Sequence, residues 1–244
     1  MKITRSTKFA VAAAAATLAL AGCSESDDSN SADGAVPDID CATGTLSGEG
    51  SSFQKNAIFE WTKLYQQACP DATINYNPTG SGAGISQFLA GQVDWAGSDA
   101  ALEGDEYDEA KQRCEGNDAL NLPMVGGAVA ISFNLDGVDS LVLDAATAAD
   151  IFLGKITAWD DPAIAELNEC ATLPAEDIVV FFRADESGTT ANFTGYLNAA
   201  APEVWTAEPG KAWPSGAAGE GKPQNAGILE AVSSTPNSIS YLDY

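Results

Sequence analysis

Residues 45–53 read TLSGEGSSF, and the fold is most readily predicted by working outward from this stretch. Its first three residues are typical of a short strand, and the glycines and serines that follow are typical of a turn. Apolar residues then recur at helical spacing from 57 to 68. The order strand, glycine turn and helix predicts that the folded part of the chain begins with a βα unit.

The same order returns further along the chain. Residues 72–76 are typical of a strand, TGSGAG at 79–84 of a turn, and residues 85–90 of a helix. A third strand is expected over 93–96, ending at GSD in 97–99. Alternating strands and helices favour a largely parallel sheet, with turn residues gathered at the carboxyl ends of the strands. We therefore expect an α/β fold with its ligand site at that edge.

The second half has the same α/β character with less regular spacing. Its strongly apolar stretch at 120–134 predicts a long strand that crosses between two lobes, with a hinge near its glycine pair. Helices are expected over 103–115, 145–152, from 190 to about 200 and over 228–232, and strands over 178–182 and 238–242. The expected domains are a first lobe over 41–126 and a second lobe over 127–244.

The N-terminus has the features of an export signal. Three basic residues precede thirteen mostly apolar residues at 9–21, too few to span a bilayer as a helix, so residues 1–22 are expected to be a signal peptide. The segment LAGC at 20–23 resembles the lipobox of bacterial lipoproteins, which predicts lipidation of Cys23; a secreted signal with a chance cysteine is the alternative. Residues 23–40 hold six acids and no base, and we expect a lipidated acidic tether.

Composition excludes several classes of protein. Of the 244 residues, 45% are hydrophobic, a globular composition that can bury a core. With 11 Lys and Arg against 35 Asp and Glu, most of the surface would repel nucleic acid and anionic membranes. The absence of histidine excludes Ser-His-Asp and Cys-His catalytic units and His-ligated zinc sites. We expect no nucleic-acid partner, no metal and no cofactor.

Four cysteines remain when Cys23 is set aside, and in an exported chain they are expected to form disulfides, with three connectivities open. Cys41 precedes the first strand, and Cys69 ends the helix that leads into the second. Because parallel neighbours place both at the same sheet end, we predict a Cys41–Cys69 bond. The pairing of Cys114 and Cys170 stays open.

Three strand-to-helix junctions carry small or hydroxylic residues, at 51–53, 80–82 and 187–189. Each offers free backbone N–H groups at a positive helix end together with a hydroxyl donor, an arrangement that suits an anion. Plain N-capping explains any one junction equally well. The candidate side-chain donors are Ser52, Ser81, Ser187 and Thr189.

Two charged groups sharpen this hypothesis. Arg183 ends a buried strand and needs either an oxyanion or a carboxylate partner; Asp185 would serve, which leaves a purely structural pair as an alternative. Asp99 would repel an anion unless the anion donates a proton to it, as phosphate does and sulfate does not. A capping or solvent-facing Asp99 is the other interpretation.

Five motifs together resemble one known family. They are GEGSSF at 48–53, TGSGAG at 79–84, VDWAGSDA at 93–100, IFLGKI at 151–156 with WDDP at 159–162, and RADESGT at 183–189. In this combination, from about Thr45 to its end, the chain resembles the high-affinity phosphate-binding lipoprotein of the bacterial phosphate-specific ABC transporter. The resemblance implies a two-lobed periplasmic-binding-protein-like α/β fold with mainly parallel central sheets. It also implies binding and delivery of phosphate to a membrane permease, without catalysis.

The resemblance further implies a set of phosphate ligands between the lobes, with Asp99 accepting the proton of the anion. The set is Ser52, Phe53, Ser81, Asp99, Arg183, Ser187, Gly188 and Thr189. Glu49 and Glu186 stand where the family usually has small residues, so we expect both to face solvent. Family members continue beyond the strand at 238–242, which predicts a C-terminally truncated chain with an incomplete first lobe.

Other functions are weighed beside this one. A secreted phosphatase sharing the anion site would need a nucleophile or metal cluster, and Ser187 has no base. A surface lipoprotein that no longer binds an anion is a second alternative, and sulfate, molybdate or phosphonate are alternative ligands. We expect a monomer on the outer face of the bacterial cell membrane, held there by its lipid anchor alone.

Overall fold

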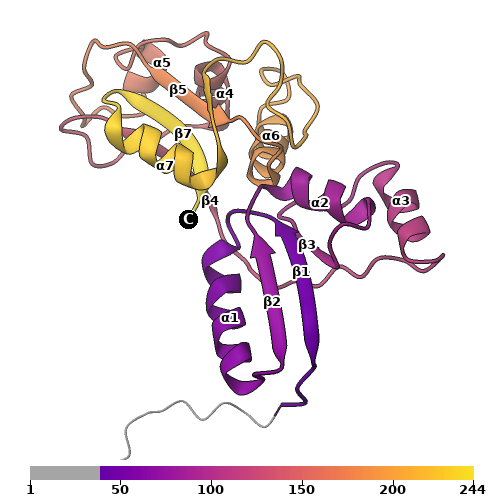
Figure 1. The fold of residues 1–244 in the computed structure, drawn as a ribbon. Coiled ribbons are helices and arrows are strands. Elements are labelled where there is room, and N and C mark those ends of the chain that lie inside the picture. Colours follow the sequence, from indigo (N-terminus) through magenta and orange to yellow (C-terminus); the bar gives the residue numbers. More distant parts are fainter. Residues whose placement is uncertain (1–38) are drawn as a thin grey trace, which may run out of the picture. The chain divides into compact units, whose positions relative to one another are not determined.

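The computed structural model describes residues 39–244. The expected signal peptide (1–22), the lipidation site Cys23 and all but the last two residues of the expected tether lie outside these residues. The first described elements are β1 (Gly44–Gly50), α1 (Lys55–Ala68), β2 (Ala72–Asn77), α2 (Ser81–Leu89) and β3 (Trp95–Gly97). The three strands form a parallel sheet in the order β2–β1–β3 (Figure 1). The repeated strand–turn–helix order predicted from the sequence is confirmed.

The predicted disulfide is present. Cys41 lies just before β1, and Cys69 follows α1 and is buried; the two are bonded across a Cα–Cα distance of 5.3 Å. The register explains the pairing, because β1 and β2 run parallel from Gly44 opposite Ala72. Cys114 and Cys170 are both free.

A second sheet is built from four strands in the order β4–β7–β5–β6. β4 and β7 are antiparallel, whereas β5 runs parallel to both of its neighbours. Its strands are β4 (Val129–Asn134), β5 (Val179–Arg183), β6 (Glu220–Lys222) and β7 (Ser238–Asp243). The helices of this half are α4 (Ala145–Phe152), α5 (Pro162–Ala165), α6 (Gly188–Ala200) and α7 (Gln224–Ser234).

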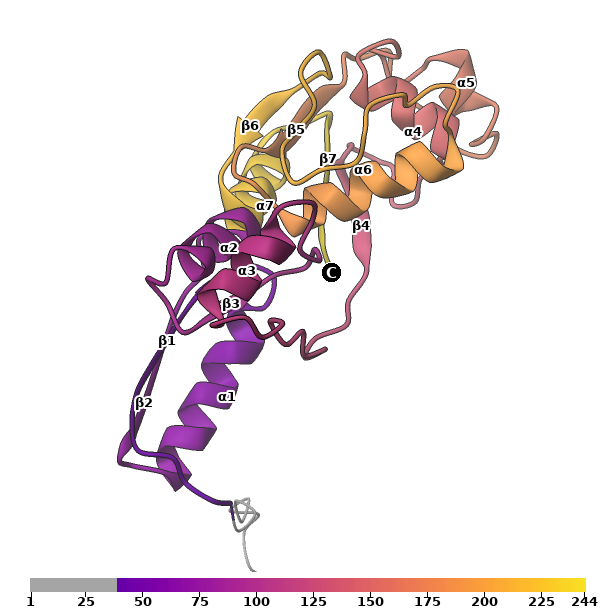
Figure 2. The same cartoon turned by 90° about the vertical axis from the view of Figure 1, so that its right-hand side faces the viewer.

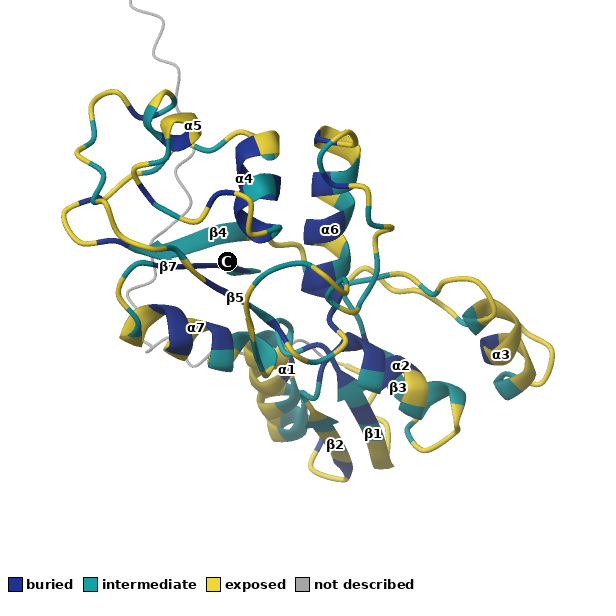
Figure 3. Cartoon of the chain, turned by 90° about the horizontal axis from the view of Figure 1, so that it is seen from above, coloured by how far each residue is buried: buried dark blue, intermediate teal, exposed yellow. Residues whose placement is uncertain are grey.

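Both faces of this second sheet are covered. Successive side chains of a strand point to opposite faces, so Val180 of β5 joins the core under α4 and α6 while Phe181 joins Ile228 and Val232 of α7. Figure 3 shows the helices on the two sides, with their buried residues turned toward the strands. The sheet is therefore a three-layer α/β arrangement, which agrees with the predicted fold class.

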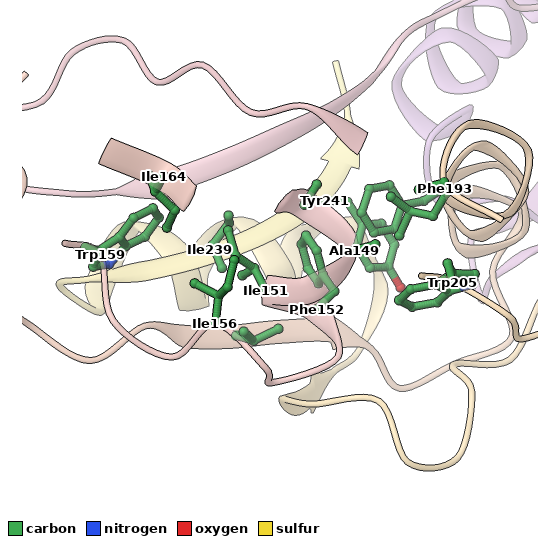
Figure 4. Packing of buried hydrophobic residues seen from close by; sticks show 14 of the residues in the cluster. Ala149, Ile151, Phe152, Ile156, Trp159, Ile164, Phe193, Trp205, Ile239 and Tyr241 are labelled. Atoms are coloured by element: carbon green, nitrogen blue, oxygen red, sulfur yellow. The ribbon is translucent and has the colours of Figure 1, made fainter. Parts of the chain in front are cut away.

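The main core lies on the α4 and α6 side of this sheet. Phe152 is fully buried, with Phe193 at 4.8 Å and Trp213 at 5.9 Å between ring centroids. Tyr241 of β7 stacks on Phe193 at 4.4 Å, and these rings lie together in Figure 4. Each such aromatic side chain contributes about 1.5–3 kcal/mol by burial, so this cluster is the principal source of stability.

The long strand expected at 120–134 is wrong in its first part. Only Val129–Asn134 is a strand; Leu120 and Leu122 are 87% and 72% exposed. Pro123 has no N–H to donate to a neighbour, and the glycine pair at 126–127 has no side chain to pack, so β-prone residues alone do not form a strand here.

Other boundaries shift less. The helix expected over 103–115 is α3 (Glu106–Arg113), with acidic residues in its first turn and basic ones in its last, as the helix dipole favours. α2 begins at Ser81, within the expected turn, and β6 has no counterpart among the predicted strands. No helix in residues 39–244 is long and apolar enough to cross a membrane.

Candidate anion-binding site

The first part of the site forms where β1 ends. Gly50 has φ +144°, and a side chain there would overlap the carbonyl oxygen of Gly97 in β3. This close approach lets Ser51 N donate to Gly97 O at 2.8 Å, while Gly80 N donates to Gly50 O at 2.8 Å. The ends of β1 and β3 and the start of α2 therefore meet at one edge of the sheet, as expected for parallel strands.

Asp99 lies at this edge, just after β3, and is the acceptor of three side chains. Ser51 Oγ donates to its Oδ2 at 2.5 Å, Ser81 Oγ donates to the same oxygen at 3.3 Å, and Gln54 Nε2 donates to Oδ1 at 2.9 Å. Ser51 and Ser81 are each only 1% exposed. Asp99 therefore belongs to a buried polar cluster, and the solvent-facing interpretation is wrong.

Arg183 is the cation of the site and is 2% exposed. Its Nε and Nη2 donate to the two oxygens of Asp185 at 2.8 and 2.5 Å, and its Nη1 donates to Asn225 Oδ1 at 2.9 Å and to Thr189 Oγ1 at 3.4 Å. Burial acts to raise the pKa of Asp185, but the hydrogen bonds and charge of Arg183 outweigh it and hold that pKa below its usual range. The expected Arg183–Asp185 pair is present and ionised.

The start of α6 supplies the remaining expected ligands. Ser187 is the N-cap, with its Oγ accepting from Thr190 N, so the capping interpretation holds for this residue. The backbone N–H groups of Gly188 and Thr189 stand in the first turn, where a helix offers no internal partner. Thr189 Oγ1 donates to Asp243 Oδ2 at 2.6 Å.

The starts of α2 and α6 meet, although α2 packs against the three-stranded sheet and α6 against the four-stranded sheet. Gly82 N donates to Glu186 O at 3.0 Å, and Asn192 Nδ2 donates to Asp99 O at 2.7 Å. A side chain at Gly188 would collide with the backbone of Asp99. Figures 1 and 2 show these two helix ends side by side. Two positive helix ends and one guanidinium therefore converge, an arrangement that attracts anions.

Ser52 and Phe53 are placed differently from the other expected ligands. Ser52 Oγ accepts from Asn225 N at 3.3 Å, so it joins the Arg183 network and has no bond to Asp99. Phe53 N donates to Ser51 Oγ at 3.1 Å. Sequence reasoning therefore missed Ser51, which lies in the quoted turn, as the serine that bonds to Asp99.

Asn225 and Asp243 were also not predicted from the sequence as site residues. Asn225 lies in the first turn of α7, in a stretch without periodicity, and Asp243 ends β7; for Asp243, the position at the carboxyl end of a strand was the one signal. Burial raises the pKa of Asp243, and the charge of Asp99 raises it further, against hydrogen bonds from Thr189 and Asn225 that lower it.

The two unusual glutamates differ. Glu186 is exposed, as predicted. Glu49 is half-buried and accepts from Thr79 Oγ1 at 2.7 Å, so the prediction that it faces solvent is wrong. Burial, together with the charges of Asp99 and Glu49, raises the pKa of Tyr76, whose hydroxyl donates to Ser51 O.

Comparison with known proteins places the chain in a class. Residues 35–244 match the family model described as "PBP superfamily domain". A phosphate-binding protein from Stenotrophomonas maltophilia shares the fold, with a TM-score of 0.62 at 23% identity, over 83% of this chain and 61% of that one. This likeness shows a periplasmic-binding-protein α/β fold.

Two curated relatives narrow the class. The phosphate-binding protein PstS 3 of Mycobacterium tuberculosis is 44% identical over 250 residues, covering 100% of this chain and 67% of the relative. PstS 2 of the same organism is 39% identical with the same coverage. The chain belongs to the family of PstS phosphate-binding proteins.

Proposed function

We propose that the chain binds inorganic phosphate at this site and delivers it to the membrane permease of a phosphate ABC transporter. The observation that carries the proposal is the convergence of Arg183 and the starts of α2 and α6 beside the carboxylate of Asp99. The guanidinium and the helix N–H groups favour an oxyanion, and Asp99 favours one that has a proton to donate. Phosphate meets both conditions, whereas sulfate would leave Asp99 facing an anion without a hydrogen bond.

All eight expected ligands belong to the proposed site: Ser52, Phe53, Ser81, Asp99, Arg183, Ser187, Gly188 and Thr189. The contacts described above support this assignment, because each residue lies at a helix start, at Asp99 or in the Arg183 network. On binding, hydroxyl groups that now donate to carboxylates would turn to the anion, and Asp99 would instead accept a hydrogen bond from a P–OH group of phosphate. We further propose that residues 41–126 and 127–244 act as two lobes around the anion.

Equilibrium dialysis with radiolabelled phosphate tests the proposal. We expect saturable binding of one phosphate per chain that excess unlabelled phosphate displaces and excess sulfate does not. Displacement of the bound labelled phosphate by excess sulfate would contradict the proposal. So would the absence of labelled phosphate binding by the folded chain. Hydrolysis of a chromogenic phosphate ester would instead favour a phosphatase.

The location is part of the same proposal. We propose that Cys23 is lipidated after removal of residues 1–22, and that the chain acts as a monomer tethered to the outer face of the cell membrane. The lipobox-like segment before Cys23 supports this. A Cys23→Ser variant should lose incorporation of labelled fatty acid and appear in the medium; unchanged membrane association of the variant would contradict the anchor.

A further inference from the structure

A second carboxylate adjoins the proposed phosphate site from the end of β7. Asp243 Oδ2 accepts from Thr189 Oγ1 at 2.6 Å and from Asn225 Nδ2 at 2.5 Å. Within residues 39–244 both of these hydrogen bonds end on Oδ2, and no protein group donates to Oδ1. The end of β7, marked C in Figures 1 and 2, lies close to the junction between the two sheets. Asp243 therefore stands one hydrogen bond from an expected ligand, with one oxygen left to accept.

Asn225 connects this carboxylate to the rest of the site. Its Oδ1 accepts from Arg183 Nη1 at 2.9 Å, and its backbone N donates to Ser52 Oγ at 3.3 Å. Its Nδ2 is the group that donates to Asp243. The carboxylate of Asp243 is thus linked, directly or through one side chain, to Thr189, Arg183 and Ser52.

The charges of the site do not balance for a doubly charged anion. One edge of the Arg183 guanidinium donates to both oxygens of Asp185, so the net charge of this pair is close to zero. Asp99 and Asp243 remain, and the charge of Asp99 acts on Asp243. Two charged groups act on Asp243: Asp99, which follows β3, and Arg183, which ends β5. Arg183 is itself paired with Asp185. Two carboxylates disfavour an approaching dianion.

We propose that Asp243 is a specificity-determining residue that makes the site prefer H₂PO₄⁻ over HPO₄²⁻. The inference rests on the proposed function and deepens it. The dihydrogen ion carries one charge and two P–OH groups, so one hydroxyl donates to Asp99 and the other to the free Oδ1 of Asp243. HPO₄²⁻ has a single hydroxyl and would leave one carboxylate facing an unprotonated oxygen. No proton is transferred; both stay on the phosphate.

Phosphate titrations of the chain over a pH series that spans the loss of the second proton of phosphate, near neutrality, test this. The dissociation constant, expressed per total phosphate, should rise about tenfold per pH unit on the alkaline side, because the binding-competent ion falls in that proportion. In an Asp243→Asn variant this slope should flatten, since the neutral amide accepts one P–OH or donates to one P–O⁻. Asp150→Asn, which removes the same charge beside exposed Lys155, is the matched control and should keep the slope.

Each outcome has one meaning. Phosphate binding with a flat slope in the wild type, or a wild-type slope in Asp243→Asn, overturns the role of Asp243 while leaving the proposed function standing. No phosphate binding at any pH overturns the proposed function itself. If Asp243→Asn does not fold, Asp243→Ser and the wild-type slope carry the same test.

Discussion

The two sheets of this molecule are stabilised in different ways. The four-stranded sheet buries a large aromatic and aliphatic cluster, in which Phe152, Trp159 and Tyr241 are fully buried. The three-stranded sheet has few buried apolar residues, and its helix α1 leaves Phe59 and Trp61 at 44% and 41% exposure. Much of the α1 ribbon in Figure 3 is accordingly coloured as exposed. A disulfide, glycine contacts and polar side chains hold that sheet instead.

The candidate site takes its residues from both of these sheets. The four-stranded sheet supplies Arg183, which ends β5 and is buried there in an ion pair with Asp185. The three-stranded sheet supplies Asp99, which is held by hydrogen bonds from Ser51 and Ser81. The proposed anchor of the anion and the proposed selecting group thus lie on different sheets.

The largest effect is expected at Arg183. Arg183→Ala leaves Asp185 half-buried without its ion-pair partner and removes the guanidinium that is bonded to Thr189 and Asn225, so binding should weaken by about 2–5 kcal/mol. Stability should also fall, because breaking a buried ion pair costs about 3–5 kcal/mol. Phosphate titration and urea unfolding measure both. Lys155→Ala, which breaks an exposed pair, is the control; equal losses in the two variants would argue against an anchoring role.

Core truncation compares the two sheets directly. Phe152→Ala should destabilise by about 3–5 kcal/mol, because the cavity cannot refill among Phe193, Trp213 and Tyr241. Phe59→Ala on the exposed face of α1 should change stability by no more than about 0.5 kcal/mol. Urea unfolding of both variants measures the contrast, and similar losses would mean that the two sheets are packed alike.

Acid should lower the free energy of unfolding by protonating Asp185 and so breaking its ion pair with Arg183. The folded-state pKa of Asp185 lies below its usual value, so the pair contributes stability above the unfolded-state pKa, near 4, and loses it as pH falls through the lower folded-state pKa. Unfolding free energies measured from neutral pH downward should therefore decline in that acid window. Asp185→Asn should remove this part of the decline; an identical acid profile in the variant would contradict the assignment.

The smallest effect on phosphate affinity is expected at Lys211. Its Nζ lies 2.9 Å from Glu106 of α3 and is 11% exposed, so it links the segment before β6 to α3. Lys211→Ala should lower phosphate affinity by a few-fold at most, since partly exposed pairs are worth about 0–1 kcal/mol. Lys63→Ala, whose pair with Glu60 lies within exposed α1, should have no effect on titration. A larger loss in the Lys63 variant would exclude this link.

Local pattern was sufficient for much of the fold. The helices and strands up to β3 follow from spacing and glycine turns, and the Cys41–Cys69 bond follows from parallel pairing. The strand predicted over 120–128 was wrong because residues of high β propensity form a strand only where a neighbouring strand can hydrogen-bond to them. Pro123 and two glycines disfavour such pairing in this stretch.

The candidate site was predictable only where its residues follow strands. Asp99 and Ser81 meet because the carboxyl ends of parallel strands share one edge. Ser51 and Ser52 cannot be told apart by spacing, because the backbone at Gly50 decides which one faces Asp99. Asn225 and Asp243 reach the site through contacts 42 and 54 residues apart in sequence, which no local pattern records.

In the proposed site, Arg183 attracts the anion and Asp99 selects it by its proton. Calorimetric titration of the wild type and an Asp99→Asn variant with phosphate and with sulfate tests this most directly. We predict tight phosphate binding and no sulfate response in the wild type, and a loss of that preference in the variant, because a neutral amide no longer repels sulfate. Sulfate binding by the wild type, or full phosphate preference in Asp99→Asn, would contradict the account.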